Sequence, residues 1–340
     1  MKFDYSVFNP PYQETNKQNQ RAKPLYNLFM DEAQKVSSKV EVIHPARFLF
    51  NAGQTPKKWN EKMLNDEHFK VLRYEPNGSN IFPNTDIKGG VAITYWDSTK
   101  DFGAIVEFIE NPILNSLAKK IKDSHCASLS DIHYNRSSYR FTNQLYTENE
   151  SCLKQVKESE KLSISSNIFD KLPNIFVEEK PSNDYYAVYG RDENSRKLKY
   201  LKKSYLAEHE NLTKWKVFVA KSNGTGKFGE CLTTPEVIAP FVVGTQTFIS
   251  FGKFDNESDA IALSKYLKTK FARCLLDICK VTPDNARKEV WKYVPLEDFT
   301  SNSDIDWSKS IPEIDQQLYR KYGFSEEEIN FIETNVKEMN

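Results

Sequence analysis

The stretch FDYSVFNPPYQ, residues 3–13, decides how the rest of the chain is interpreted. Its first half, Phe3 to Phe8, is aromatic and β-branched, which predicts a buried strand. Asn9-Pro10-Pro11-Tyr12 cannot continue that strand, because each proline lacks an N–H and fixes its own φ. The sequence therefore predicts a rigid bend at the carboxyl end of a strand, where open α/β sheets bind ligands.

The first hundred residues alternate between strand-like and helical segments, as α/β domains do. We expect strands over 39–43, 69–74 and 90–96, and helices over 24–36 and 57–64. Helical spacing puts one apolar stripe on the first helix, made of Leu25, Leu28, Phe29, Ala33 and Val36. Residues 1–110 are thus expected to form part of a doubly wound, Rossmann-like sheet.

The pattern changes after residue 110, where short β-like runs and polar loops predict an α+β domain over 111–300. Strands are expected over 185–189 and 215–220, and one continuous helix from Ser258 to Lys280. The segment VWKYVPLEDF, residues 290–299, begins like a strand. Residues 301–340 are expected to form a helical segment, whose last helix begins with a capping pattern of Ser325 and Glu328.

Composition narrows the class of protein. The chain has 340 residues and a formal net charge of zero. It contains no run of 18 apolar residues and no charged segment followed by an apolar one at its start, so neither a membrane span nor a secretory signal is expected. Five scattered cysteines without zinc spacing predict free thiols in a reducing cytoplasm and no metal. They are Cys126, Cys152, Cys231, Cys274 and Cys279.

Two basic stretches contain aromatic residues and no carboxylate. RKLKYLKKSY, residues 196–205, has five basic residues, and KYLKTKFAR, residues 265–273, has four. Such stretches are candidates for contact with a nucleic-acid backbone, which makes Lys202 and Lys203 candidate DNA-binding residues. A solvated lysine face is an equally good explanation of each stretch.

The motif Asn9-Pro10-Pro11-Tyr12 after a hydrophobic strand resembles the catalytic loop of DNA methyltransferases that act on exocyclic amines. The resemblance implies that the Asn9 side-chain oxygen and the Pro10 carbonyl oxygen accept the hydrogens of the adenine amine. Two such acceptors localise the nitrogen lone pair for attack on a methyl group, without a strong base. Tyr12 would stack on a base flipped out of the duplex.

The rest of the chain resembles adenine-N6 DNA methyltransferases of type II restriction-modification systems, whose target-recognition domain lies C-terminal to the catalytic domain. VEVIHPARFLF (40–50) is similar to the strand after the catalytic loop, and NIFPNTDIKGGVAITYW (80–96) to the next loop and strand. The resemblance implies that Phe82 packs against the flipped adenine. It also implies S-adenosylmethionine as methyl donor and double-stranded DNA as partner.

One departure from that family concerns the cofactor. Its members place a Phe-x-Gly-x-Gly turn upstream of the catalytic loop, whereas Asn9 is preceded by eight residues here. We therefore expect a separate polypeptide to carry the cofactor-binding half, and an exposed edge on the strand Phe3–Phe8. A non-catalytic DNA-binding module and a truncated, inactive fragment are the alternatives.

A permuted order is a further possibility, because Gly224–Gly229 fits G-x-G-x-x-G by letter. A lone match of this kind is weak, and a recognition-domain loop that brings Lys227 close to a phosphate is the favoured interpretation. His44 is expected to be structural. His125, His133 and Cys126 do not form a metal-binding pattern, and Asp86 and Lys88 are expected to lie in a solvated turn.

Overall fold

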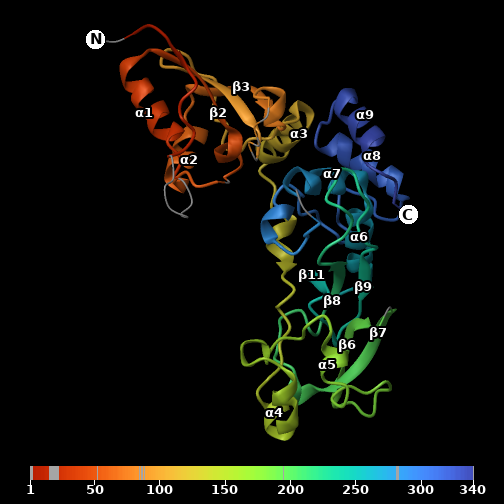
Figure 1. The fold of residues 1–340 in the computed structure, drawn as a ribbon. Coiled ribbons are helices and arrows are strands. Elements are labelled where there is room, and N and C mark those ends of the chain that lie inside the picture. The colour runs from red at the N-terminus through yellow and green to blue at the C-terminus, as the bar shows by residue number, and fades with distance from the viewer. Residues whose placement is uncertain are drawn as a thin grey trace. The chain divides into compact units, whose positions relative to one another are not determined.

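A computed structural model describes residues 3–14, 23–51, 53–83, 85, 87, 89–193, 195–280 and 283–339 of the chain. The chain forms two compact units, Met1–Asn115 and Ser116–Asn340 (Figure 1). One helix, α3 (Pro112–Asp123), contains the boundary between them. Both units mix helices and strands.

The first unit is built around one mixed sheet. Its elements are β1 (Ser6–Phe8), α1 (Tyr26–Val36), β2 (Lys39–Pro45), α2 (Lys57–Leu64), β3 (Phe69–Glu75) and β4 (Val91–Asp97). The strand order is β1-β2-β4-β3, with β1 and β2 parallel and the other two pairs antiparallel. The expected α/β alternation is present, and the doubly wound arrangement itself stays a prediction.

The core of the first unit lies between this sheet and the two helices. Side chains of β2 alternate between buried and half-buried positions, as expected for a strand with one covered face. Val40 and Val42 pack there with residues of α1 and α2, among them Met30 and Met63. Their burial holds β2 and its neighbours in register, because a shift by one residue would move every apolar side chain to the other face.

The predicted buried strand Phe3–Phe8 is wrong in two respects. Only Ser6–Phe8 is a strand, and its side chains, at the edge of the sheet, are exposed or half-buried and not buried. Phe3 is 55% exposed and Val7 is 68% exposed, so these apolar side chains are not core residues. The expectation of an exposed edge agrees with this arrangement.

The predicted apolar stripe of α1 is also largely wrong. The buried face carries Tyr26, Asn27, Met30 and Ala33, whereas Leu28, Phe29 and Val36 are exposed. Contacts from outside the helix explain the choice of face. The Tyr26 ring stacks on His44, with ring centres 5.6 Å apart, and also packs against Phe48 and Trp59.

The second unit contains two sheets and a helical part (Figure 1). Its strands are β5 (His133–Tyr134), β6 (Tyr185–Asp192), β7 (Ser195–Lys202), β8 (Trp215–Ala220), β9 (Glu236–Ile238), β10 (Val242–Gly244) and β11 (Phe248–Phe254). The sheets have the orders β10-β6-β7 and β5-β11-β8-β9. Its helices after α3 are α4 (Gln144–Glu148), α5 (Ile168–Lys171), α6 (Glu257–Lys268), α7 (Lys270–Cys279), α8 (Ile311–Lys321) and α9 (Glu326–Asn335).

The expected helix Ser258–Lys280 is two helices, α6 and α7. Thr269 separates them with an extended ψ of 148°, and its hydroxyl accepts a hydrogen bond from the Ala272 N–H. A threonine that caps a new helix in this way ends the preceding one. The strand-like start at Val290 is also wrong, because Lys288–Trp291 is a 3₁₀ helix. The capping box of Ser325 and Glu328 is confirmed at the start of α9.

Candidate active site

The bend after β1 is anchored to the segment that precedes α1. The Tyr12 carbonyl accepts a hydrogen bond of 3.1 Å from the Leu25 N–H, and the Glu14 N–H donates to Lys23 at 2.9 Å. Pro10 is buried, whereas Asn9 and Pro11 are exposed. The loop therefore has a defined path, in which the rigid prolines present Asn9 at the surface.

A second loop, between β3 and β4, is held by its own hydrogen bonds. The Phe82 N–H donates to the Gly78 carbonyl at 2.9 Å, and the Thr85 hydroxyl donates to the Phe82 carbonyl at 2.6 Å. Ser79 donates from its hydroxyl to the Thr85 carbonyl at 2.8 Å. These bonds fix the position of the half-buried Phe82 ring.

The two loops meet at one cavity of about 370 Å³, which is within the range of small-ligand sites. The Tyr12 and Phe82 rings lie edge to face, with centres 6.3 Å apart and an angle of 72° between their planes. The structure thus brings together residues that are 70 positions apart in the sequence. The cavity is lined by Asn9, Pro10, Tyr12, Gln13, Phe82, Thr85 and Ile87.

Two hydrogen-bond acceptors are open at this cavity. Within the described part of the chain, the Asn9 side chain makes no hydrogen bond, and no backbone N–H donates to the Pro10 carbonyl. Among the described residues the buried Tyr12 hydroxyl has no hydrogen-bond partner, and burial raises its pKa. The Asn9 side-chain oxygen and the Pro10 carbonyl can accept hydrogen bonds from the N–H groups of an amine, and the Asn9 amide nitrogen and the Tyr12 hydroxyl can donate.

Sequence reasoning found four of these lining residues and missed Gln13, Thr85 and Ile87. Thr85 and Ile87 follow Phe82 in the same loop, so their closeness to Phe82 in the sequence could have indicated that they line the cavity. Pro11 is not among the lining residues, and its contribution is to keep the loop rigid. Asp86 and Lys88 lie outside the described residues.

His44 is a core residue. It is fully buried, and burial lowers its pKa to about 4. Its Nδ1 lies 3.0 Å from the Pro45 carbonyl, which can only accept, and its Nε2 lies 2.9 Å from the Thr94 hydroxyl. The Pro45 carbonyl therefore assigns a proton to Nδ1, and the lowered pKa keeps the ring neutral, in agreement with the expected structural role.

The basic stretch 196–205 lies mostly on β7, where carboxylates from other elements neutralise it. Lys199 is 2.9 Å from Glu178, and Lys202 is 3.2 Å from Glu148. The ammonium of Lys203 lies 4.9 Å from the centre of the Tyr186 ring. A DNA-binding role for Lys202 and Lys203 stays a prediction. It requires Lys202 to exchange its partner Glu148 for a phosphate of the DNA. The remaining ion pairs of the stretch are Arg196–Glu236 and Lys197–Asp192.

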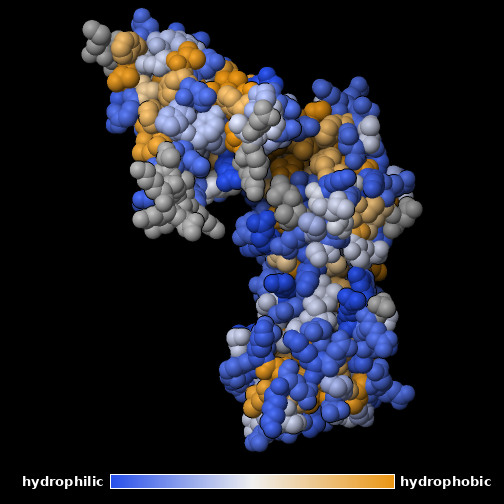
Figure 2. Space-filling model, in the orientation of Figure 1, coloured by the Kyte–Doolittle hydropathy of each residue, from blue (hydrophilic) through white to orange (hydrophobic). Residues whose placement is uncertain are grey.

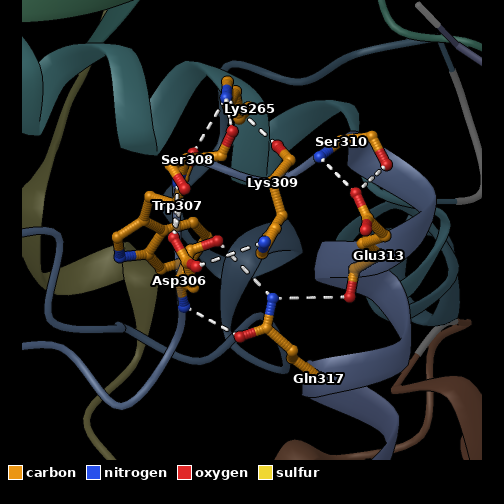
Figure 3. Close-up of polar contacts among 8 residues, drawn as sticks. All are labelled: Lys265, Asp306, Trp307, Ser308, Lys309, Ser310, Glu313 and Gln317. Atoms are coloured by element: carbon orange, nitrogen blue, oxygen red, sulfur yellow. Dashed lines mark hydrogen bonds and ion pairs between the residues drawn. The ribbon is translucent and has the colours of Figure 1, made fainter.

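The basic stretch 265–273 serves the fold. Figure 3 shows Lys265 of α6 with its ammonium directed at the loop before α8. It donates to the carbonyls of Trp307, Ser308 and Lys309 at 2.8, 3.4 and 3.2 Å. Lys270 pairs with a glutamate of α9, and Arg273 is only 1% exposed. These contacts favour a structural role for the three residues over contact with a nucleic acid.

The glycine-rich loop Gly224–Gly229 does not have the surroundings of a cofactor turn. It follows β8, which pairs antiparallel with both of its neighbours. Glu230 accepts hydrogen bonds from the N–H groups of Thr225 and Gly226 at 2.7 and 3.1 Å, and these bonds lower its pKa. A carboxylate thus occupies donors that a phosphate would need, beside the exposed Lys227.

The described residues contain no group of three or more metal-ligating side chains. His133 packs against Phe251 in the β5–β11 pair, with ring centres 5.3 Å apart, and burial lowers its pKa to about 4. None of the helices in the described ranges is long and apolar enough to cross a membrane.

Comparison with known proteins finds a family model that matches the first part of the chain. Residues 1–82 match the family model of the Eco57I restriction-modification methylase. A protein of Mycoplasma pneumoniae described as an uncharacterized adenine-specific methylase is 28% identical over 102 residues. These residues are 29% of this chain and 24% of the relative, so the matched segment spans about a quarter of that protein. The N-terminal segment is thus similar, at the level of the family, to DNA methylases of restriction-modification systems.

Three solved structures are similar to the chain at low scores. The type IIG restriction endonuclease BpuSI has a TM-score of 0.30 and 12% identity, covering 88% of this chain and 44% of that one. The type IIL restriction-modification enzyme MmeI, in complex with DNA, has a TM-score of 0.38 and 9% identity, covering 98% and 56%. The type ISP enzyme LlaBIII, bound to DNA, has a TM-score of 0.28 and 10% identity, covering 83% and 28%.

Proposed function

We propose that this chain provides the catalytic loop and the DNA-recognition unit of a site-specific adenine-N6 DNA methyltransferase in a restriction-modification system. The observation that carries the proposal is the cavity where Asn9, Pro10, Tyr12 and Phe82 converge. The family match over residues 1–82 supports it, since it covers both loops up to Phe82. Such an enzyme would act on DNA in the cytoplasm.

The cavity residues would act by binding and orienting a flipped adenine. Tyr12 and Phe82 offer apolar ring surfaces to the base, and stacking of a base on an aromatic side chain contributes about 1–3 kcal/mol. Asn9 and the Pro10 carbonyl would accept the two amine hydrogens and so increase the nucleophilicity of the nitrogen. Acceptors held in place by a proline-rigid loop require little reorganisation when the reaction occurs.

S-adenosylmethionine, the methyl donor implied by the family, supplies an electrophilic methyl group when it is bound. The glycine-rich loop that the sequence offers as a cofactor turn does not fit it. The one glycine-rich candidate, Gly224–Gly229, has N–H groups bound to Glu230 and an antiparallel setting. Accordingly, no residue of the described chain is assigned to hold this cofactor.

The edge of β1 is where we propose that a cofactor-binding segment docks, on a separate polypeptide. Exposed apolar residues lie on the segment that leads into β1, on β1 itself and at both ends of α1, whose last residue, Val36, accepts a hydrogen bond of 2.7 Å from the Phe3 N–H. Figure 2 shows hydrophobic surface on the part of this unit that carries α1. A strand added to this edge would satisfy its free backbone groups and cover these side chains. They are Phe3, Val7, Leu28, Phe29 and Val36.

Asn9→Ala tests the catalytic proposal. We expect it to abolish methyl transfer to duplex DNA while DNA affinity stays unchanged, because Asn9 is assigned to the amine and not to the backbone. The assay uses the chain with a co-expressed cofactor-binding polypeptide and measures transfer of a labelled methyl group. Asn302→Ala, which makes the same change in an exposed loop, is the control. Unchanged turnover in Asn9→Ala would remove the proposal.

A non-catalytic DNA-binding module is the second candidate, and the occupation of the N–H groups of the glycine-rich loop by Glu230 favours it. Fluorescence of 2-aminopurine at the target base separates the two candidates, since only the methyltransferase requires base flipping. Isothermal titration tests the need for a partner. Micromolar binding of S-adenosylmethionine at one site per purified chain would contradict the docking proposal.

A further inference from the structure

A cavity of about 470 Å³ in the second unit is built from three separate segments of the chain. One segment follows β5, one follows β8, and one precedes the 3₁₀ helix Lys288–Trp291. None of the three stands out as basic in the sequence. The cavity is lined by Asn135, Arg136, Ser137, Lys221, Ser222, Asp284, Ala286 and Arg287.

Backbone hydrogen bonds hold two of these segments together. Ser222 and Asp284 form an antiparallel bridge, and the Asn285 N–H donates to the Lys221 carbonyl at 2.7 Å. Asn285 itself is fully buried, and its side-chain amide donates to the Ala220 carbonyl at 3.1 Å. The walls that carry Lys221 and Arg287 are therefore fixed to the end of β8.

The cavity has more cations than carboxylates. Arg136, Lys221 and Arg287 line it with one acidic residue, Asp284. Asp284 lies 4.0 Å from Arg287, at the limit of an ion pair between two half-exposed side chains. No carboxylate in the described ranges pairs with Arg136.

The position of Lys221 shows that its charge is poorly compensated. Its ammonium donates to the Ser166 hydroxyl at 3.2 Å, a neutral partner. Burial, and next the neighbouring Arg136 cation, lower its pKa, whereas Asp284 opposes the shift. Cations that face one cavity repel each other, so an anion bound between them would be stabilised by all three.

This cavity differs from the basic stretch on β7. There, Arg196, Lys197, Lys199 and Lys202 each have a carboxylate partner. A new anion at β7 would compete with those carboxylates, whereas at the cavity it would meet a net positive charge. The cavity also offers hydrogen-bond donors that match the oxygen acceptors of a phosphate group. They are the guanidinium groups of Arg136 and Arg287 and the hydroxyls of Ser137 and Ser222.

We propose that this cavity binds a backbone phosphate of duplex DNA and so positions the recognition unit on its substrate. The proposal rests on the proposed function in that it takes DNA as the partner of the second unit. A phosphodiester is favoured over a free phosphate because the cavity is open and much larger than one phosphate group. Contacts of this kind set the register of a protein on DNA without reading its sequence.

The test compares duplex binding by the complete chain and by the double variant Arg136→Ala/Arg287→Ala, using fluorescence anisotropy over a series of salt concentrations. We expect affinity at low salt to fall about tenfold for all duplex sequences. The slope of log K against log salt should decrease in magnitude by about 1, the effect of losing one phosphate contact. Circular dichroism and thermal unfolding verify that the double variant is folded. The single variant Arg136→Glu, at an exposed position, gives a second measurement of the loss of duplex affinity.

The control is the double variant Lys253→Ala/Arg320→Ala, which removes the same charge at two exposed positions away from the cavity. Equal losses in both double variants, or wild-type affinity and slope in the cavity variant, would overturn the proposal. Failure of the wild-type chain to bind duplex DNA would overturn it as well.

Inorganic phosphate tests whether the cavity binds a free phosphate ion or a backbone phosphate of DNA. One possible result is that phosphate at matched ionic strength raises the Tm of the wild-type chain but not that of the cavity variant, while both chains bind duplex DNA with equal affinity. In that case the cavity binds free phosphate, and its assignment to DNA is wrong. None of these readouts uses methyl transfer. A chain that binds DNA through the cavity but does not methylate it, even with the co-expressed cofactor-binding polypeptide, would refute the proposed function alone.

Discussion

Acidification is expected to destabilise the first unit through His44. The ring is fully buried, and burial lowers its pKa to about 4, whereas an unfolded histidine has a pKa of about 6.5. Below pH 6.5 the unfolded chain binds a proton that the folded chain excludes, so stability is complete above that pH and is lost as the pH falls toward 4. Linkage gives a loss of about 1.4 kcal/mol at pH 5.5 and about 3.4 kcal/mol below pH 4.

Hydrogen exchange of the β2 and β4 amides measures this effect, because those strands report on the first unit alone. After correction for intrinsic rates, the opening free energy should fall between pH 7.5 and pH 5.5 in the wild-type chain. It should change much less in His44→Gln, which keeps a hydrogen-bonding side chain that does not titrate.

His68→Gln is the matched control in the same unit. His68 is half-buried, and its hydrogen bond to the Lys100 carbonyl raises its pKa, so its contribution is present at low pH and is lost as the pH rises. The control should therefore keep the acid sensitivity of the wild type. An NMR titration that places the His44 pKa near 6.5, or equal pH slopes in the wild type and His44→Gln, would refute the reasoning.

Three further predictions concern single side chains. Tyr12→Phe should keep methyl transfer and leave the stability equal or higher, because it removes a buried hydroxyl that has no partner within the described residues. Tyr12→Ala should lose methyl transfer. A labelled-methyl assay measures the transfer, and thermal unfolding measures the stability. Lys265→Met should reduce the free energy of unfolding by about 1–3 kcal/mol with no change in DNA affinity, because three carbonyls lose their donor. Wild-type stability in urea would contradict that role. Thr269→Ala should cost about 1 kcal/mol through loss of the α7 cap, measured in the same way, while Thr300→Ala in an exposed loop should cost less.

Local chemistry determined much of the first unit. The two prolines end β1 whatever surrounds them, because they lack N–H groups and restrict φ. Helix α2 and strands β2, β3 and β4 lie where periodicity and composition predicted them, within two residues at each end. The capping box at Ser325 is likewise a contact between residues three positions apart.

Tertiary contacts decided which faces are buried and which charges are free. Tyr26 and Met30 form the inner face of α1 because an aromatic cluster from β2 and α2 receives them, and a periodic pattern on one helix does not contain that information. Lys199 and Lys202 are neutralised by carboxylates 21 and 54 positions away, as the residue numbers show.

The two cavities also depend on distant segments. Tyr12 meets Phe82 only because β1, β2 and β4 are paired in one sheet, and Arg136, Lys221 and Arg287 meet only because β8 is bridged to Asp284. The sequence by itself determined the catalytic-loop motif and the local elements, since sterics and capping act between near neighbours. Only the tertiary structure decided the partners of the cations and the lining of each cavity, because ion pairing and burial depend on groups that the chain brings together from far apart.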